Sequence, residues 1–240
     1  MKKYLALACV MGCIAQPAFA ANKINLTNFT GAAAQADFKK FSEDLGSALS
    51  YKAVTPAEPL GITGFDLGLE VSSTEAKSMA TATGNSSVKS LIVPKLHVYK
   101  GLPLGIDVAA FYSAVPTTNI TLIGGELRYA ILEGGMAMPA IAVRGAMTRL
   151  SGVDKFSFST KSLDISISKG FAMLTPYAGV GRVWTDSAPD STIPGLKKES
   201  FQQAKTFVGA NLNFGLMNFA AEYDKTGAAA TTSIKFGFRF

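Results

Sequence analysis

Cysteine and histidine are scarce in this 240-residue sequence, and each scarcity excludes a class of chemistry. The two cysteines, Cys9 and Cys13, lie near the start, so the rest of the chain has no thiol for a disulfide, a zinc site or a nucleophile. A single histidine, His97, cannot form a histidine pair for a metal. Only a carboxylate calcium site remains conceivable, and Asp186 and Asp190 lack the spacing of an EF-hand loop. We therefore expect no metal and no cofactor.

Long apolar runs and a strong charge imbalance are also missing. Hydrophobic residues make up 48% of the chain, yet after residue 20 no stretch approaches the roughly 18 apolar residues of a membrane helix. The formal charge of +6 falls to +4 without residues 1–20, which contain Lys2 and Lys3 and no acid. This mild, dispersed charge predicts no nucleic-acid partner. If the chain enters a membrane, it must do so with strands closed into a barrel, because every backbone group in lipid needs a partner.

The first 20 residues have the pattern of a secretory signal peptide. Lys2 and Lys3 precede an apolar run over residues 4–15, and an Ala-Phe-Ala site ends at Ala20, where we expect cleavage. The alternative is a lipid attached to Cys13, because residues 10–13 loosely match a lipoprotein signal. Met11 fits that signal poorly, so we favour cleavage after Ala20.

From residue 62 onward, apolar and polar residues alternate with a period of two, which is typical of strands. Clusters of Gly, Pro, Asn, Asp and Ser divide this region into about ten segments. The predicted strands are residues 62–72, 90–100, 104–113, 120–131, 140–149, 156–169, 174–184, 204–214, 217–223 and 231–240.

The last segment carries its apolar side chains on one face: Ile234, Phe236, Phe238 and Phe240. This ending resembles the closing strand of Gram-negative outer-membrane β-barrels, in which a terminal Phe and alternating aromatic positions form the assembly signal. The resemblance implies an all-β, closed antiparallel transmembrane barrel of about ten strands. It also implies outer-membrane lipid, periplasmic chaperones and the barrel assembly machinery as partners, with both termini in the periplasm.

Connection lengths fit this topology. Residues 21–61 form a periplasmic lead-in, an amphipathic helix and a Pro-containing connector, and residues 62–240 form the barrel. The outer loops would be residues 73–89, 114–119, 150–155, 185–203 and 224–231; the periplasmic turns would be 101–103, 132–139, 170–173 and 215–216. Short periplasmic turns and longer outer loops are typical of such barrels.

If the apolar face of each strand meets lipid, the opposite faces bring charged residues of both signs into one interior. We expect cross-strand ion pairs and water to satisfy them, because an isolated buried charge is costly. A structural network is the favoured interpretation and a solute-selecting ring is the alternative. The predicted lumen-lining residues are Asp66, Glu70, Lys95, Asp107, Glu126, Arg128, Arg144, Asp164, Lys205, Glu222, Lys235 and Arg239.

One segment before the strands has a helical period. Over residues 31–50, Phe38, Phe41, Leu45 and Leu49 recur at spacings of three and four. The favoured interpretation docks this stripe against the periplasmic base of the barrel or the membrane interface. The alternative places the helix in the lumen as a plug or gate.

The predicted function is non-enzymatic, with no catalytic residue. It is either a narrow or helix-gated passage for small solutes, or a structural and surface-interaction role carried by loops 73–89 and 185–203. A lipid-active hydrolase is the first alternative. It would need His97 as a base, and His97 has no recognisable partner motif. A carrier of a hydrophobic ligand, using the apolar helix stripe, is the second.

Overall fold

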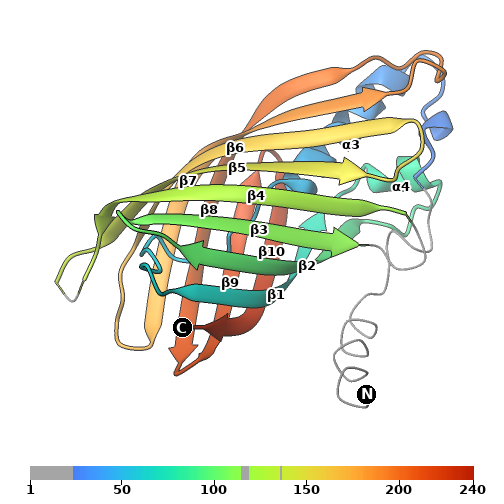
Figure 1. Cartoon of the computed structure of the whole chain (residues 1–240). Helices are drawn as coiled ribbons and strands as arrows, with labels where there is room; N and C mark the ends of the chain where they lie inside the picture. Colours follow the sequence, from blue (N-terminus) through green and yellow to red (C-terminus); the bar gives the residue numbers. More distant parts are fainter. Residues whose placement is uncertain (1–23, 115–118, 136) are drawn as a thin grey trace.

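Ten antiparallel strands form one closed barrel in the computed structural model, which describes residues 24–114, 119–135 and 137–240 (Figure 1). Each strand pairs with its sequence neighbours, and β1 closes the ring by pairing with β10. The predicted all-β barrel with a short N-terminal helix is confirmed. The expected signal peptide lies outside the described residues.

The elements follow one another without crossovers. The short 3-10 helix η1 (Leu26–Asn28) and helix α3 (Ala34–Leu49) precede the strands, and α4 (Met79–Thr83) lies between the first two strands. The strands are β1 (Phe65–Glu75), β2 (Ser90–Gly101), β3 (Ile106–Ala114), β4 (Thr121–Glu133), β5 (Ala140–Ser151), β6 (Phe156–Ser168), β7 (Leu174–Pro189), β8 (Glu199–Phe214), β9 (Met217–Thr226) and β10 (Ala229–Arg239).

The alternation of the sequence separates two surfaces, because successive side chains of a strand point to opposite sides. The outer surface carries large, exposed apolar residues from strand to strand, among them Leu127, Ile165, Val180, Val208 and Ile234. Buried polar and charged side chains occupy the alternate positions and point inward. Among the described residues, no helix combines the length and hydropathy that crossing a membrane requires.

Several predicted loops are shorter or more ordered than expected. β7 and β8 extend to Pro189 and back from Glu199, so the predicted loop 185–203 shrinks to residues 190–198. The predicted loop 224–231 is a tight turn at residues 227–228, with Gly227 at a φ of 61°. Loop 73–89 contains α4, whose Met79 is fully buried. The strand extensions were missed because polar residues on both faces hide the alternation. Helix α4 was missed because its five residues are too few to show a helical period.

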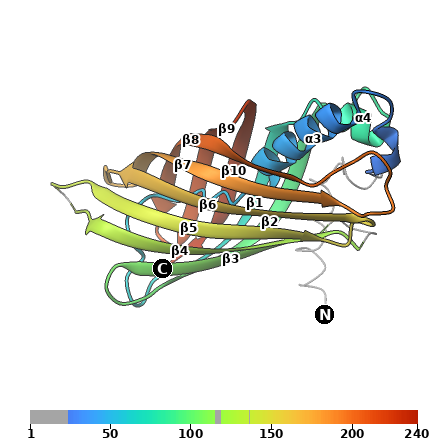
Figure 2. The ribbon, with the colours of Figure 1, turned by 90° about the horizontal axis from the view of Figure 1, so that it is seen from above.

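The barrel has two unlike ends (Figure 2). We call the end with Phe240 and the connections 102–105, 134–139, 169–173 and 215–216 the turn end. The other end, with the connections 76–89 and 190–198, holds α3, α4 and η1 and is called the helix end. The described chain therefore begins at the end opposite to Phe240. The prediction of a shared periplasmic side for both termini stays a prediction, and the described residues give it no support.

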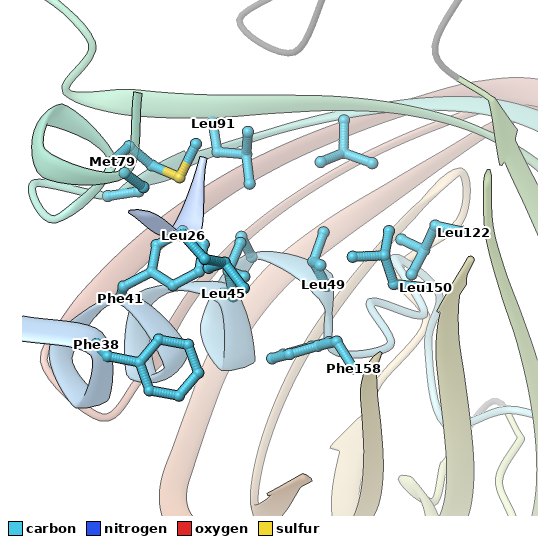
Figure 3. Close-up of a cluster of buried hydrophobic side chains, with 14 of the residues drawn as sticks. Leu26, Phe38, Phe41, Leu45, Leu49, Met79, Leu91, Leu122, Leu150 and Phe158 are labelled. Carbon is cyan, nitrogen blue, oxygen red and sulfur yellow. The ribbon is translucent and has the colours of Figure 1, made fainter. Parts of the chain in front are cut away.

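Helix α3 fills the mouth of the barrel at the helix end (Figure 3). Phe38, Phe41, Leu45 and Leu49 are almost completely buried in one apolar cluster. Inward-pointing residues of the wall complete that cluster: Leu91, Leu122, Leu150 and Phe158. The favoured interpretation, docking outside the barrel base, was therefore wrong. The wall itself has an apolar inner lining at the helix end, and that lining accepts the stripe.

Candidate functional site

The chain passes through the lumen between the helix and the first strand. Residues 50–60, which we call the lumen segment, follow α3 at the helix end and lead to β1 at the turn end. Lys52, Ala53, Val54 and Ala57 are all 0% exposed, so the barrel wall encloses residues 50–57 on every side, and the segment becomes exposed at Glu58. Pro56 keeps the chain from continuing the helix. The segment thus occupies the lumen between the helix end and the turn end.

Polar side chains of seven different strands bind the lumen segment. Four of these bonds go to its backbone carbonyl or amide groups near the middle: Lys205 Nζ donates to Tyr51 O at 3.0 Å, Tyr99 Oη to Ala53 O at 2.5 Å, Arg128 Nη1 to Pro56 O at 2.5 Å, and Ala57 N donates to Ser168 Oγ at 3.1 Å. Three more are Lys52 Nζ to Asp224 Oδ1 at 2.8 Å, Arg239 Nη2 to Thr55 Oγ1 at 2.8 Å, and Leu60 N to Asp107 Oδ1 at 3.1 Å. Most of these hydrogen bonds are therefore made to backbone groups of the segment, and they depend on its backbone conformation more than on its side chains.

The predicted lumen-lining residues all lie on the inner side of the wall, where every one is buried except the half-buried Arg239. The expected cross-strand ion pairs are present. Lys95 Nζ lies 2.7 Å from Glu70 Oε1, Arg128 Nη2 lies 2.6 Å from Asp107 Oδ2, and Arg144 Nη2 lies 3.0 Å from Asp164 Oδ2. Asp164 also binds Lys205, and Asp66 binds both Lys235 and Arg239. Glu126 approaches Arg144 only to 3.8 Å.

Register explains these pairs. Glu70 lies directly across from Lys95 and Arg144 lies directly across from Asp164, so opposite charges meet on the same face of neighbouring strands. Glu126 and Glu222 are exceptions among the carboxylates: all four of their oxygens are buried and none makes a close hydrogen bond among the described residues. The network therefore has more acceptors than the wall's own donors satisfy.

Glycines on the inner wall give aromatic rings room to lie across the strands. A Cβ at Gly124 would come within 2.2 Å of the Phe111 ring, and one at Gly179 within 2.3 Å of the Phe207 ring. Gly209 faces the Tyr177 ring in the same way. Gly124 and Gly179 thus allow an aromatic ring to pack closely against the strand.

His97 is part of the same buried network. Its Nε2 lies 2.5 Å from Glu70 Oε2, and its ring packs edge to face on Tyr51 of the lumen segment. Phe111 covers another side at a centroid distance of 5.3 Å. The fully buried imidazole is therefore a wall residue that lies behind the lumen segment.

Two parts of the site had not been predicted. The first is the lumen segment itself, whose Lys52 and backbone complete the wall's hydrogen bonds. The second is the apolar inner lining at the helix end, which was visible as inward apolar positions such as Leu122, Leu150 and Phe158. Within the described part of the chain, no three His, Cys, Asp or Glu side chains are placed to hold a metal ion.

Comparison with known proteins finds no match to a protein-family model and none among curated proteins. Among solved structures, the N-terminal β-barrel domain of Pseudomonas aeruginosa OprF is similar over 73% of this chain and 97% of that domain, with 13% identity and a TM-score of 0.39. The Yersinia pestis outer-membrane protein Ail is similar over 73% of this chain and 99% of its own, with 11% identity and a TM-score of 0.36. A KdgM porin has 8% identity and a TM-score of 0.38 over 73% of this chain.

Scores this low leave the class of the protein to its own geometry. An even number of antiparallel strands, complete closure, an apolar outer surface and a charged interior are the features of bacterial outer-membrane barrels. This chain is an outer-membrane β-barrel protein with its own N-terminal segment inside the barrel.

Proposed function

We propose that this protein is a gated passage for small solutes, closed in this conformation by α3 and the lumen segment. The supporting observation is that the inner wall binds the segment through polar groups that water or a polar solute would also satisfy. Ten strands enclose a lumen only slightly wider than that of eight-stranded barrels, which their own side chains fill. A single extended chain is what this lumen holds, so its displacement would open a narrow, hydrophilic path.

The orientation of the barrel is part of this proposal. Connections at the turn end include residues 215–216, whereas those at the helix end include residues 76–89. Short turns face the periplasm in barrels of this class. The turn end, with Phe240, would then be periplasmic, and α3 would close the outer mouth. The predicted assembly-signal residues Ile234, Phe236, Phe238 and Phe240 all point outward from β10 or its end, where the assembly machinery and lipid could reach them.

A structural, surface-interaction role is the second candidate, and the ordered cap at the helix end favours it. Asp44 Oδ2 of α3 accepts hydrogen bonds from Ser78 N at 3.0 Å and Ser78 Oγ at 2.6 Å, and Asn25 N donates to Ala82 O at 3.0 Å. These bonds join α3, η1 and the 76–89 connection into one surface. Such a surface would suit recognition by a partner without any solute movement.

The hydrolase and carrier alternatives receive less support. A base must reach its substrate, and His97 is fully buried behind Tyr51. The helix stripe proposed for a hydrophobic ligand is already packed against Phe156 and Phe158 of the wall. Both alternatives would require the same displacement as the passage, without an observation of their own.

Single-channel recording tests the passage directly. The parent is compared with a variant lacking residues 21–60, and with a full-length variant cut after folding at a protease site inserted beside the exposed Ile62. We expect the parent to be closed most of the time, the truncated barrel to conduct, and the cut barrel, whose α3 is still anchored, to open more often than the parent. If neither altered form conducts, the passage is wrong and the surface role remains.

A reversible lock sharpens the same experiment. Ser42 Oγ of α3 and Ser187 Oγ of β7 are 2.7 Å apart, so cysteines at both positions should form a disulfide that holds the helix to the wall. The matched control places cysteines at Thr148 and Thr160, whose hydroxyls are also 2.7 Å apart but join two wall strands. Any openings of the parent should vanish in the first variant until reductant is added. Equal behaviour of the two variants would contradict gating by α3.

A further inference from the structure

One buried cation in the lumen belongs to the segment and not to the wall. Lys52 Nζ is 2.8 Å from Asp224 Oδ1, 2.8 Å from Ser47 O and 3.1 Å from Ser50 Oγ. Asp224 and Lys52 side chains are both 0% exposed. Three acceptors around one ammonium group match its three donor hydrogens. Only one of these acceptors, the Asp224 carboxylate, comes from the wall.

The wall around this ammonium has unused acceptor capacity. Asp224 Oδ2 has no hydrogen-bond partner among the described residues, and neither oxygen of Glu222 has one. Glu222 occupies the next inward position along β9 and is only 2% exposed. The Tyr177 ring of β7 lies over Gly209 of β8, which places its hydroxyl beside Glu222 of β9, whereas Asp224 Oδ2 has no such neighbouring donor in the described part of the chain. Buried acceptors without donors indicate a place where a further donor binds.

The nearby wall cations are already engaged. Lys205 Nζ binds Asp164 Oδ2 at 3.1 Å and Tyr51 O at 3.0 Å, and Arg144 binds the same Asp164. The buried inner wall of the described chain has seven carboxylates, Asp66, Glu70, Asp107, Glu126, Asp164, Glu222 and Asp224, against five cations, Lys95, Arg128, Arg144, Lys205 and Lys235. The half-buried Glu199 and Arg239 add one charge of each sign, and Lys52 supplies a further cation. Without the lumen segment, Asp224 would lose the cation that pairs with it.

We propose that the inner face of β9, at Asp224 and Glu222, is a binding site for a primary ammonium group. Lys52 fills the site from within the chain, and a small organic amine fills it when the lumen segment is displaced. This inference rests on the proposed gated passage, because the ammonium site would make cationic amines the solutes that the passage carries. A competing amine would also favour the open state, because it binds the wall only where Lys52 has left.

Chemical rescue tests the site in the full-length protein. Lys52→Ala removes the equivalent of propylammonium and leaves Asp224 without its cation. Such a small ligand should bind weakly, with a dissociation constant on the order of 50 mM. At about this concentration, propylammonium chloride should restore at least half of the decrease in the unfolding midpoint that Lys52→Ala causes. Propanol, which has the same shape without the charge, and propionate should restore none. If Lys52→Ala does not fold, the refolding yield with and without propylammonium replaces the midpoint as the readout.

Two variants show whether the rescue occurs at this site. Lys52→Met fills the volume of the missing chain, so propylammonium should have no effect on it. Lys52→Ala combined with Asp224→Asn removes the carboxylate, and rescue should disappear. An absent rescue, an equal rescue by propanol, or a rescue that persists with Asp224→Asn would each overturn the ammonium site.

Ion selectivity separates this inference from the gate. In the full-length barrel cut beside Ile62, the reversal potential in a KCl gradient should show a preference for K⁺ over Cl⁻. Asp224→Asn with Glu222→Gln should reduce that preference at least twofold. A conducting barrel that prefers Cl⁻ would overturn the cationic solute class and leave the gate intact. A cut barrel that stays closed would contradict the gate, and the rescue experiment would then decide the ammonium site alone.

Discussion

The two halves of the enclosed N-terminal chain are held by opposite kinds of interaction. Helix α3 is held at the helix end by apolar contacts, with Phe38 and Phe41 packed against Phe156 of the wall. The lumen segment is held by hydrogen bonds and ion pairs, such as those of Lys52 and Arg128. Burial of an apolar side chain stabilises the folded state by about 1.5–3 kcal/mol. In a buried ion pair, by contrast, the cost of removing both charges from water often cancels most of the attraction between them.

This difference assigns unlike roles to the two halves. The helix should provide most of the net stability of the closed state, because nothing in water replaces its apolar contacts. The lumen segment should determine position and register, because water can replace each of its polar contacts once the helix has moved. Release of the gate would therefore begin at α3, and the segment would follow.

The largest effect is expected at the helix. Phe41→Ala should destabilise the closed state by about 4 kcal/mol, because Phe41 is fully buried among Phe29, Phe38 and Phe156. Limited proteolysis of the folded barrel should then cut within residues 34–49. Phe214→Ala is the matched control, since Phe214 is 45% exposed on the outer surface. Equal protease sensitivity of the two variants would contradict an apolar anchor.

The next effect is expected at the guanidinium that joins wall and segment. Arg128→Met should cost about 3 kcal/mol in urea unfolding, because it leaves Asp107 buried without its cation and removes the donor to Pro56 O. Adding Asp107→Leu should recover most of that loss, because the unpaired charge is gone. A double variant no more stable than the single one would show that the pair itself, and not the orphaned charge, determines the stability.

A smaller effect is expected from a single neutral hydrogen bond to the segment. Tyr99→Phe removes the donor to Ala53 O and should cost about 1 kcal/mol. The barrel should stay folded, and brief openings in single-channel recordings should become more frequent. Tyr112→Phe is the control, because Tyr112 points outward and is 51% exposed. Unchanged opening in Tyr99→Phe would mean that the helix alone keeps the lumen closed.

The smallest effect is expected at the exposed pair on the outer face of β7. Lys198 Nζ and Asp186 Oδ1 are 2.8 Å apart, but both side chains are more than half exposed. Lys198→Ala should change the unfolding midpoint by less than the equivalent of about 1 kcal/mol, because solvent screens such pairs. A larger shift would indicate that the extended ends of β7 and β8 contribute more to closure than their exposure suggests.

The sequence predicted the wall of the barrel better than its contents. Ten segments of period two were recognisable because lipid outside and polar groups inside impose opposite demands on alternate residues. The ends of β7 and β8 escaped prediction for the same reason: at Thr185–Ser187 and at Gln202 and Gln203 both faces are polar, so the alternation disappears. β7 is 16 residues long, whereas crossing the membrane requires about 9–11.

The contents of the lumen depend on contacts between residues far apart in sequence. The stripe of α3 was recognised, but its partner surface consists of single inward residues from several strands, such as Leu91, Leu122 and Leu150. The lumen segment has no periodic pattern, since wall groups bind its backbone and not a motif. Lys52 lies in no motif of the connector. Its partner Asp224 is 172 residues away in the sequence, so their contact at 2.8 Å is seen only in the folded structure.

The segment inside the barrel also constrains how the molecule assembles. Residues 34–60 precede every strand in the chain, yet they end up enclosed by a ring whose last seam, between β1 and β10, joins residues at opposite extremes of the sheet region. A bulky helix such as α3 does not thread easily through a finished ring filled with side chains. Formation of the β1–β10 seam should therefore come last, with the sheet curling around a core that its own leading residues provide.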